Sequence, residues 1–124
     1  MAQMEKVHND NHDQTTMQAI NGLWKEQLYC DITIICGDKS IEAHKVVLLS
    51  VSPYFKNLFK YEKAESNTCE IDRNVLTRGE VLQTIIEYAY TGNITFDGEN
   101  VQELLVAASF LQIDFIVKKS EKYM

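Results

Sequence analysis

The segment CDITIICGDKSIEAH, residues 30–44, most constrains the fold of this chain, because sequences with helical periodicity border it on both sides. Its first part, CDITIIC, is rich in β-branched residues and predicts a strand. GDKS is typical of a four-residue turn, and IEAH predicts a short second strand. The chain therefore contains a β-hairpin that must be covered by helices.

An amphipathic helix is predicted just before this hairpin. Thr15 and Gln18 have the spacing of a capping box at a helix start. The apolar stripe that follows has helical spacing and consists of Met17, Ile20, Leu23, Trp24 and Leu28. Such a helix either lies on its own core or docks onto another chain.

The sequence after the hairpin predicts more helices and one more strand. Ser52 before Pro53 is typical of an N-cap followed by proline at the first helical position. CEI, residues 69–71, predicts a short strand, and Gly92 is expected to end a helix that a second capping box, Thr77 with Glu80, begins. The expected order is helix, hairpin, helix, helix, strand and three helices. This is an α+β fold in which a cluster of five to six helices flanks a small mixed sheet.

Composition predicts one globular domain of 124 residues with a net charge of −6. We expect residues 1–13 to be a disordered tail and residues 14–124 to form the domain, because the tail has little apolar content. The negative charge argues against binding to nucleic acid, and no stretch is long and apolar enough for a membrane span. A cytosolic or nuclear chain is expected.

Reactive groups do not converge in this sequence. Cys30, Cys36 and Cys69 have no C-x-x-C spacing and are expected to be reduced, with no structural zinc site. His44 is the only histidine inside the predicted domain, and no signature of a catalytic partner accompanies it. We therefore expect a binding module rather than an enzyme, with no metal and no cofactor. The apolar helix surface is large for a small sheet and favours a homodimer.

Three segments together resemble a BTB/POZ domain. They are YCDITIICGDKSIEAHKVVLLSVSPYFKNLF, EYAYTGNITF and NVQELLVAASFLQI, in this order. The resemblance runs from about Thr15 to the C-terminus and is most similar to the N-terminal domain of BTB-Kelch (kelch-like) proteins.

The resemblance implies a homodimer in which the first helix packs against the partner subunit. The expected interface residues are Met17, Ile20, Leu23, Trp24, Leu28, Asp31 and Lys45. In this family an aspartate of the first strand and a basic residue after the second lie at the bottom of a groove at the interface. Asp31 and Lys45 occupy these positions, and we expect their charges to compensate each other or other charges there. His44 would support the hairpin from within.

The resemblance also implies a substrate adaptor of a cullin-3 RING ubiquitin ligase. Such a protein bridges the cullin-3 N-terminal domain to a substrate protein bound by a domain beyond residue 124. The expected cullin contacts are Tyr61, Lys63, Glu65 and Tyr88. The family pattern at this loop is a hydrophobic residue, any residue and glutamate. Here Lys63 stands at the hydrophobic position, where its aliphatic stem can cover apolar surface.

Two other functions fit the same fold. One is the BTB domain of a transcription regulator, which recruits corepressor peptides to the dimer groove. The other is a plain homo-oligomerisation module that binds no cullin. The sequence downstream would distinguish them, through kelch repeats or zinc fingers.

Overall fold

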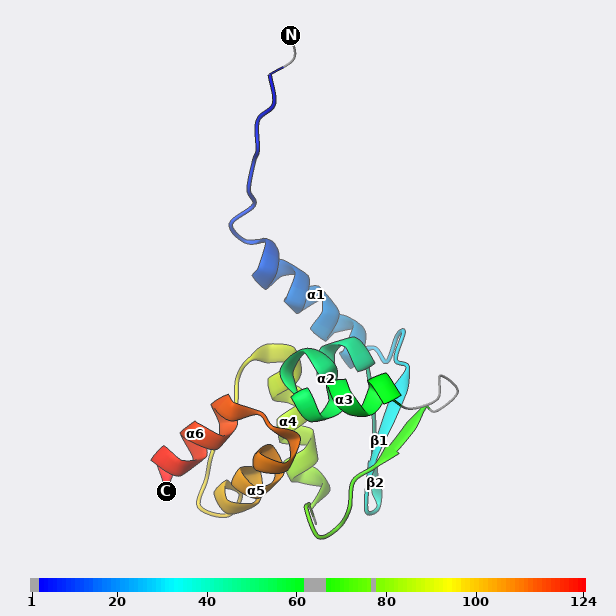
Figure 1. Cartoon of the computed structure of the whole chain (residues 1–124), viewed down its shortest axis with the longest axis vertical. Helices are drawn as coiled ribbons and strands as arrows, with labels where there is room; N and C mark the ends of the chain where they lie inside the picture. Colours follow the sequence, from blue (N-terminus) through cyan, green and yellow to red (C-terminus); the bar gives the residue numbers. More distant parts are fainter. Residues whose placement is uncertain (1–2, 62–66, 77) are drawn as a thin grey trace.

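The computed structural model describes residues 3–61, 67–76 and 78–124. Its elements are α1 (His12–Lys25), β1 (Ile32–Cys36), β2 (Lys39–Ala43), α2 (Lys45–Val51), α3 (Pro53–Tyr61), β3 (Thr68–Glu70), α4 (Gly79–Thr91), α5 (Val101–Leu111) and α6 (Asp114–Tyr123). Figure 1 shows the helices grouped around a small sheet, with α1 leading into the hairpin. The predicted α+β class and the predicted order of elements are confirmed.

The sheet is mixed and has β1 in the centre, in the order β2-β1-β3. β1 pairs antiparallel with β2, where Ile34 faces Ile41, and parallel with β3, where Ile34 faces Cys69. The hairpin turn is shorter than predicted, because Lys39 already pairs with Cys36. Only Gly37 and Asp38 remain in the turn, and Gly37 takes a positive φ of 59° that suits glycine.

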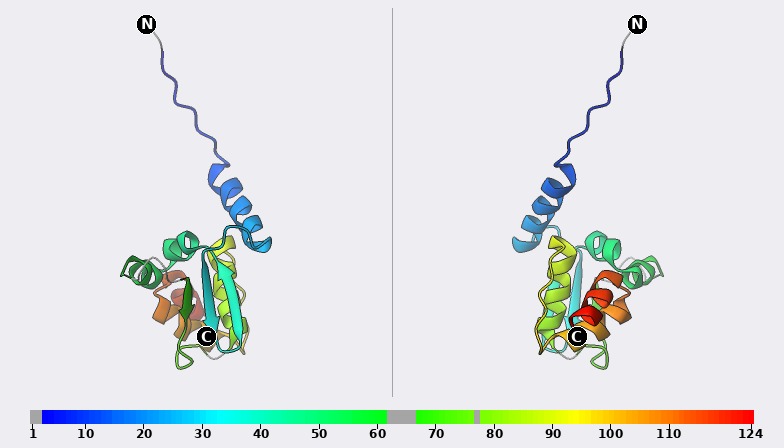
Figure 2. Two further views of the ribbon diagram at one scale, coloured as in Figure 1. Left: turned by 90° about the vertical axis from the view of Figure 1, so that its right-hand side faces the viewer. Right: turned by 90° about the vertical axis from the view of Figure 1, so that its left-hand side faces the viewer.

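One hydrophobic core joins the sheet to the helices. β1 alternates between buried and half-buried residues, so that Ile32, Ile34 and Cys36 share the buried face. Figure 2 shows α4 running along the sheet. The largest fully buried side chains of the core outside β1 include Leu48, Leu82, Ile86, Leu104 and Ile116.

Ser52 joins two helices and ties them to a third. Its Oγ accepts a hydrogen bond from the Phe55 N–H at 3.2 Å, as an N-cap does, and donates one to the Leu111 carbonyl at 2.6 Å. The side chain is 1% exposed. The predicted start of α3 is confirmed, and the same hydroxyl also holds α3 against the end of α5.

Gly92 ends α4, as predicted. It has a φ of 76° and its N–H bonds to the Tyr88 carbonyl, so the helix closes with a left-handed residue. An extended segment, residues 93–97, leads from there to the turn before α5.

The helix α1 begins earlier than predicted. It starts at His12, so Thr15 lies inside the helix and does not cap it. Asp13 in the first turn favours this start, because a negative charge stabilises a helix N-terminus. Figures 1 and 2 show that the N-terminal part of α1 and the extended residues before it project from the body. Ile20 and Trp24, in the C-terminal half of α1, pack against the core.

Residues 3–61, 67–76 and 78–124 contain neither a candidate membrane-spanning helix nor a candidate metal-binding cluster. No helix there is long and apolar enough to cross a membrane. No group of three or more His, Cys, Asp or Glu side chains is arranged there to hold a metal ion.

We expect Ser52→Ala to lower the free energy of unfolding by about 1–2 kcal/mol, because it removes both the cap and the bond to Leu111. Ser50→Ala is the matched control. The exposed Ser50 hydroxyl donates only to the Val46 carbonyl of its own helix, and its loss should change stability by less than about 0.5 kcal/mol. Urea denaturation measures both variants. Equal stability of the two would contradict the role of Ser52.

Candidate protein interaction surfaces

A hydrogen-bonded tyrosine connects the hairpin to α4. The Tyr90 hydroxyl oxygen lies 2.8 Å from the backbone nitrogen of His44 and 2.5 Å from its Nδ1. The other ring nitrogen, Nε2, is 2.8 Å from the Leu28 carbonyl oxygen. His44 is only 8% exposed and Tyr90 only 2%. His44 therefore binds the end of β2 both to α4 and to the residues that follow α1.

The hydrogen-bonding capacity of these partners shows how both ring nitrogens of His44 are engaged. The phenol oxygen accepts the backbone N–H, so its own hydrogen is free to be donated to Nδ1. The Leu28 carbonyl accepts only, so Nε2 must carry a hydrogen. Each nitrogen of the imidazole thus has a partner within the chain. This is a structural role, as expected for His44 from the sequence.

Trp24 completes this group from α1. Its ring stacks on Tyr90 with centroids 4.6 Å apart and an interplanar angle of 4°, and its Nε1 donates to the Glu42 carbonyl at 2.8 Å. Only 4% of Trp24 is exposed. The indole packs in the core of its own subunit, so it has almost no surface for a partner. Periodicity placed it on the apolar stripe but did not show which chain covers it.

Asp31 acts on α2 through the backbone. Its Oδ1 accepts a hydrogen bond of 2.7 Å from the Lys45 N–H, the first residue of that helix. The Lys45 ammonium lies 5.7 Å from the centroid of the Phe59 ring. The structure thus brings the two predicted residues together, with the Asp31 carboxylate on the Lys45 amide.

The other predicted residues of α1 keep free surface. Met17, Ile20 and Leu23 are half-buried in the isolated chain. Leu28, which follows the helix, is 45% exposed, and Tyr29 beside it is 81% exposed. Val46 at the start of α2 adds a further exposed side chain. These residues are apolar side chains with free surface on α1, in the residues that follow it and at the start of α2.

Tyr61 lies at the end of α3 and is 78% exposed. The Lys60 ammonium sits 5.5 Å from the centroid of its ring. The other two predicted residues of this loop, Lys63 and Glu65, lie outside the described residues. The ring of Tyr61 is therefore the described part of the predicted cullin contact.

Tyr88 is placed differently from Tyr61. Its ring stacks on Phe115 of α6, with centroids 5.7 Å apart, and burial raises the pKa of its hydroxyl. The side chain is half-buried and packs against the core. Tyr88 is thus engaged at the contact between α4 and α6.

Sequence reasoning missed an aromatic pair on α3 and α5. Tyr54 and Phe110 have ring centroids 4.5 Å apart, and Phe110 is 38% exposed. Val106, one helical turn before Phe110, is 52% exposed. The exposed apolar positions 106 and 110 share one face of α5 at a spacing of four residues, which is the signal that could have found this surface.

Removing the Tyr90 hydroxyl is expected to destabilise the fold. Tyr90→Phe leaves the His44 N–H and Nδ1 without their partner and should cost about 1–3 kcal/mol. Tyr88→Phe, on the same helix, is the control. No hydrogen bond to the Tyr88 hydroxyl is found in the described parts of the chain, so its loss should cost under about 0.5 kcal/mol. A similar cost for both would contradict the linking role of Tyr90. Chemical denaturation gives both values.

The same variant changes the dependence of stability on pH. Burial raises the pKa of Tyr90 to about 12, above its ordinary value of about 10. Above pH 10 the unfolded chain releases this proton while the folded chain retains it, so stability falls between about pH 10 and pH 12. Tyr90→Phe should show a smaller fall over this window than the unmodified chain, measured by denaturation at successive pH values.

The chain matches the family model of the BTB/POZ domain over residues 20–124. It is 41% identical to human Kelch-like protein 28 over 108 residues, which is 87% of this chain and 19% of that protein. It is also 41% identical to human Kelch-like protein 3 over 105 residues, which is 85% of this chain and 18% of that protein. The chain thus spans about a fifth of the length of these relatives.

A solved structure has the same fold. The BTB domain of zebrafish PATZ1 superposes with a TM-score of 0.87 at 26% sequence identity, and the match covers 97% of each chain. This structural match agrees with the fold described above. This chain belongs to the BTB/POZ domain family.

Proposed function

We propose that this chain is a dimeric adaptor module that joins cullin-3 to a substrate-binding domain in a cullin-3 RING ubiquitin ligase. The similarity to Kelch-like proteins supports the adaptor role. The observation that carries the proposal is the position of α1, which projects from the body of its own subunit (Figure 1). The substrate would be bound by a domain outside this sequence, and the module would act in the cytoplasm.

The helix α1 needs a covering surface that its own chain does not supply. Isolated helices shorter than about 12–15 residues are marginal in water, so α1, with 14 residues, depends on packing. Within the subunit, Trp24 is its only buried residue. Met17, Ile20, Leu23 and Leu28 would gain cover from the same helix of a second copy, as the two-fold symmetry of a homodimer allows.

The segment before α1 adds to the same interface. Residues 3–11 precede the helix without regular structure, and Met4 and Val7 are 97% and 81% exposed. Apolar side chains on an arm that leaves the body are suited to contact with a partner subunit. Trp24 serves this dimer indirectly, since its stack on Tyr90 sets the direction of α1.

The cullin-binding surface would lie around the end of α3. Tyr61 is an exposed aromatic side chain there, and such residues dominate the binding energy of interfaces. The paired rings of Tyr54 and Phe110 extend the apolar surface to α5. Lys63 and Glu65 belong to this surface by sequence alone.

We expect the chain to elute from size exclusion with a light-scattering mass of twice 14.3 kDa. The double variant Met17→Asp/Leu28→Asp should weaken the dimer by roughly a hundredfold or more, because each change puts a charge into the apolar contact. Leu28→Asp alone and Val106→Asp are a matched pair of single changes, because Leu28 is 45% exposed and Val106, on α5, is 52% exposed. Only Leu28→Asp should weaken the dimer. A monomeric unmodified chain, or equal effects of both variants, would contradict the interface.

Mixing with the cullin-3 N-terminal domain tests the second surface. We expect a complex whose affinity falls roughly tenfold or more in Tyr61→Ala, because an exposed aromatic anchor is lost. Tyr123→Ala, on α6, should leave it unchanged. Lys63→Met should strengthen binding by restoring a hydrophobic side chain to the loop. Calorimetry measures all four proteins. A dimer that binds no cullin would show a plain oligomerisation module instead.

A further inference from the structure

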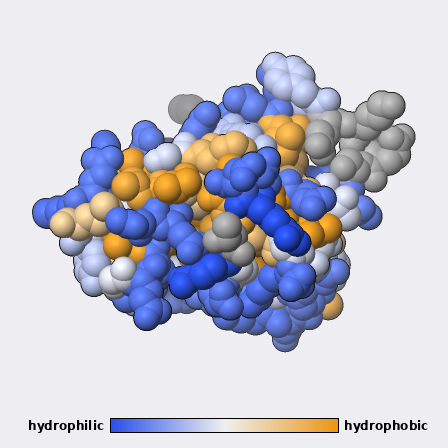
Figure 3. Space-filling model, turned by 90° about the horizontal axis from the view of Figure 1, so that it is seen from below, coloured by the Kyte–Doolittle hydropathy of each residue, from blue (hydrophilic) through white to orange (hydrophobic). Residues whose placement is uncertain are grey.

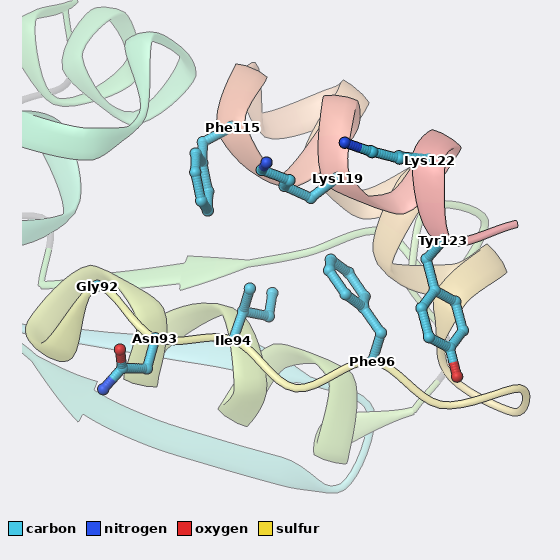
Figure 4. Close-up of a pocket in the computed structure, with 8 residues that line it drawn as sticks. All are labelled: Gly92, Asn93, Ile94, Phe96, Phe115, Lys119, Lys122 and Tyr123. Carbon is cyan, nitrogen blue, oxygen red and sulfur yellow. The ribbon is translucent and has the colours of Figure 1, made fainter.

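A cleft of about 470 Å³ lies between α6 and the extended segment that follows α4. Its lining residues are Gly92, Asn93, Ile94, Phe96, Phe115, Lys119, Lys122 and Tyr123. Figure 4 shows Ile94 and Phe96 pointing from the segment toward α6, with Phe115 and Lys119 on the opposite side. Its volume is within the range of pockets that bind small molecules or a few side chains.

The apolar side chains that line this cleft are fixed by contacts with other rings and with the core. Phe115 stacks on Tyr88, and the Phe96 and Tyr123 rings have centroids 5.6 Å apart. Ile94 and Phe96 are half-buried and pack against the core. Phe115 is nevertheless 46% exposed and Tyr123 53%. The cleft is therefore formed before any ligand arrives, which lowers the cost of binding.

Two lysines give the cleft a positive rim in a protein of net charge −6. Lys119 and Lys122 are three residues apart on α6, so both face the same side. The Lys119 ammonium lies 5.7 Å from the centroid of Phe115. In the described segments, neither ammonium lies within ion-pair distance of a carboxylate. Figure 3 shows apolar groups exposed among hydrophilic ones on the side where α6 lies.

We propose that this cleft binds a peptide segment of another protein in which apolar side chains stand next to glutamate or aspartate. The apolar side chains enter between Ile94, Phe96 and Phe115, and the carboxylates meet Lys119 and Lys122. Charge complementarity favours this partner at the cleft, because the rim there is positive. Elsewhere the negative net charge of the chain would repel an acidic segment. The arm of a second copy fits less well, because Lys6 accompanies Glu5 between Met4 and Val7.

A fluorescein-labelled peptide of leucine, phenylalanine and glutamate is the probe. A second peptide carries lysine in place of every glutamate. Fluorescence anisotropy with the full chain should show that the glutamate peptide binds roughly tenfold more tightly or more, with the difference shrinking at high salt. Equal binding of the two peptides would overturn the proposal.

Charge reversal tests the lysines directly. Lys119→Glu/Lys122→Glu should reverse the preference between the two peptides. Lys56→Glu/Lys118→Glu is the matched control, with the same change of charge outside the cleft, and should keep the preference. Ile94→Ser should weaken the glutamate peptide without changing the sign of the preference. Circular dichroism and the thermal midpoint confirm that each variant is folded. Equal loss in both double variants would show general electrostatics and overturn the site.

Deleting residues 1–11 tests whether the cleft is occupied by the arm of a second copy rather than by another protein. If the glutamate peptide binds equally well with and without the arm, the cleft is free for another protein, as proposed. If it binds only after the deletion, the arm of a second copy fills the cleft and the proposal is wrong. The result does not depend on cullin binding, because the probe contains no cullin.

Discussion

The hydroxyl of Tyr90 is the contact on which the arrangement of this domain depends. It holds the backbone and the ring of His44, and the ring of the same tyrosine carries Trp24 of α1. The other nitrogen of His44 reaches the Leu28 carbonyl just beyond α1. Three elements, the hairpin, α1 and α4, thus meet at one buried polar group. A polar group at this depth is tolerated because each of its hydrogen bonds is made.

This contact determines which side chains of α1 remain exposed for a partner. It anchors the helix by its C-terminal end, where Trp24 is buried, and leaves the preceding turns beyond the body (Figure 2). A helix fixed at one end presents the same apolar side chains in a constant direction. This rigidity reduces the entropy that a dimer would lose on forming. The core of the subunit and the proposed interface are therefore built from one amphipathic stripe.

Local patterns in the sequence predict where helices and strands lie. They do not predict which side chains pack against those elements. Ser52-Pro53 and Gly92 mark helix ends correctly because capping depends on a few neighbouring residues. Trp24 and Tyr88 stay predicted interface residues, and the structure adds that Trp24 stacks on Tyr90 and Tyr88 on Phe115 within the chain. Periodicity identifies an apolar face, but the element that covers it can come from any distance along the chain. The cleft beside α6 was missed for the same reason, since its two walls are separated in sequence.

The charges near the start of α2 bear on the cost of forming the proposed interface there. A carboxylate that enters a contact without partners is strongly disfavoured. Asp31 already accepts the Lys45 N–H, and the Lys45 ammonium lies over Phe59. A second subunit that covered these residues would meet groups with partners from their own chain. The role of Asp31 and Lys45 in a dimer would be to hold the start of α2, and with it the exposed Val46, in position.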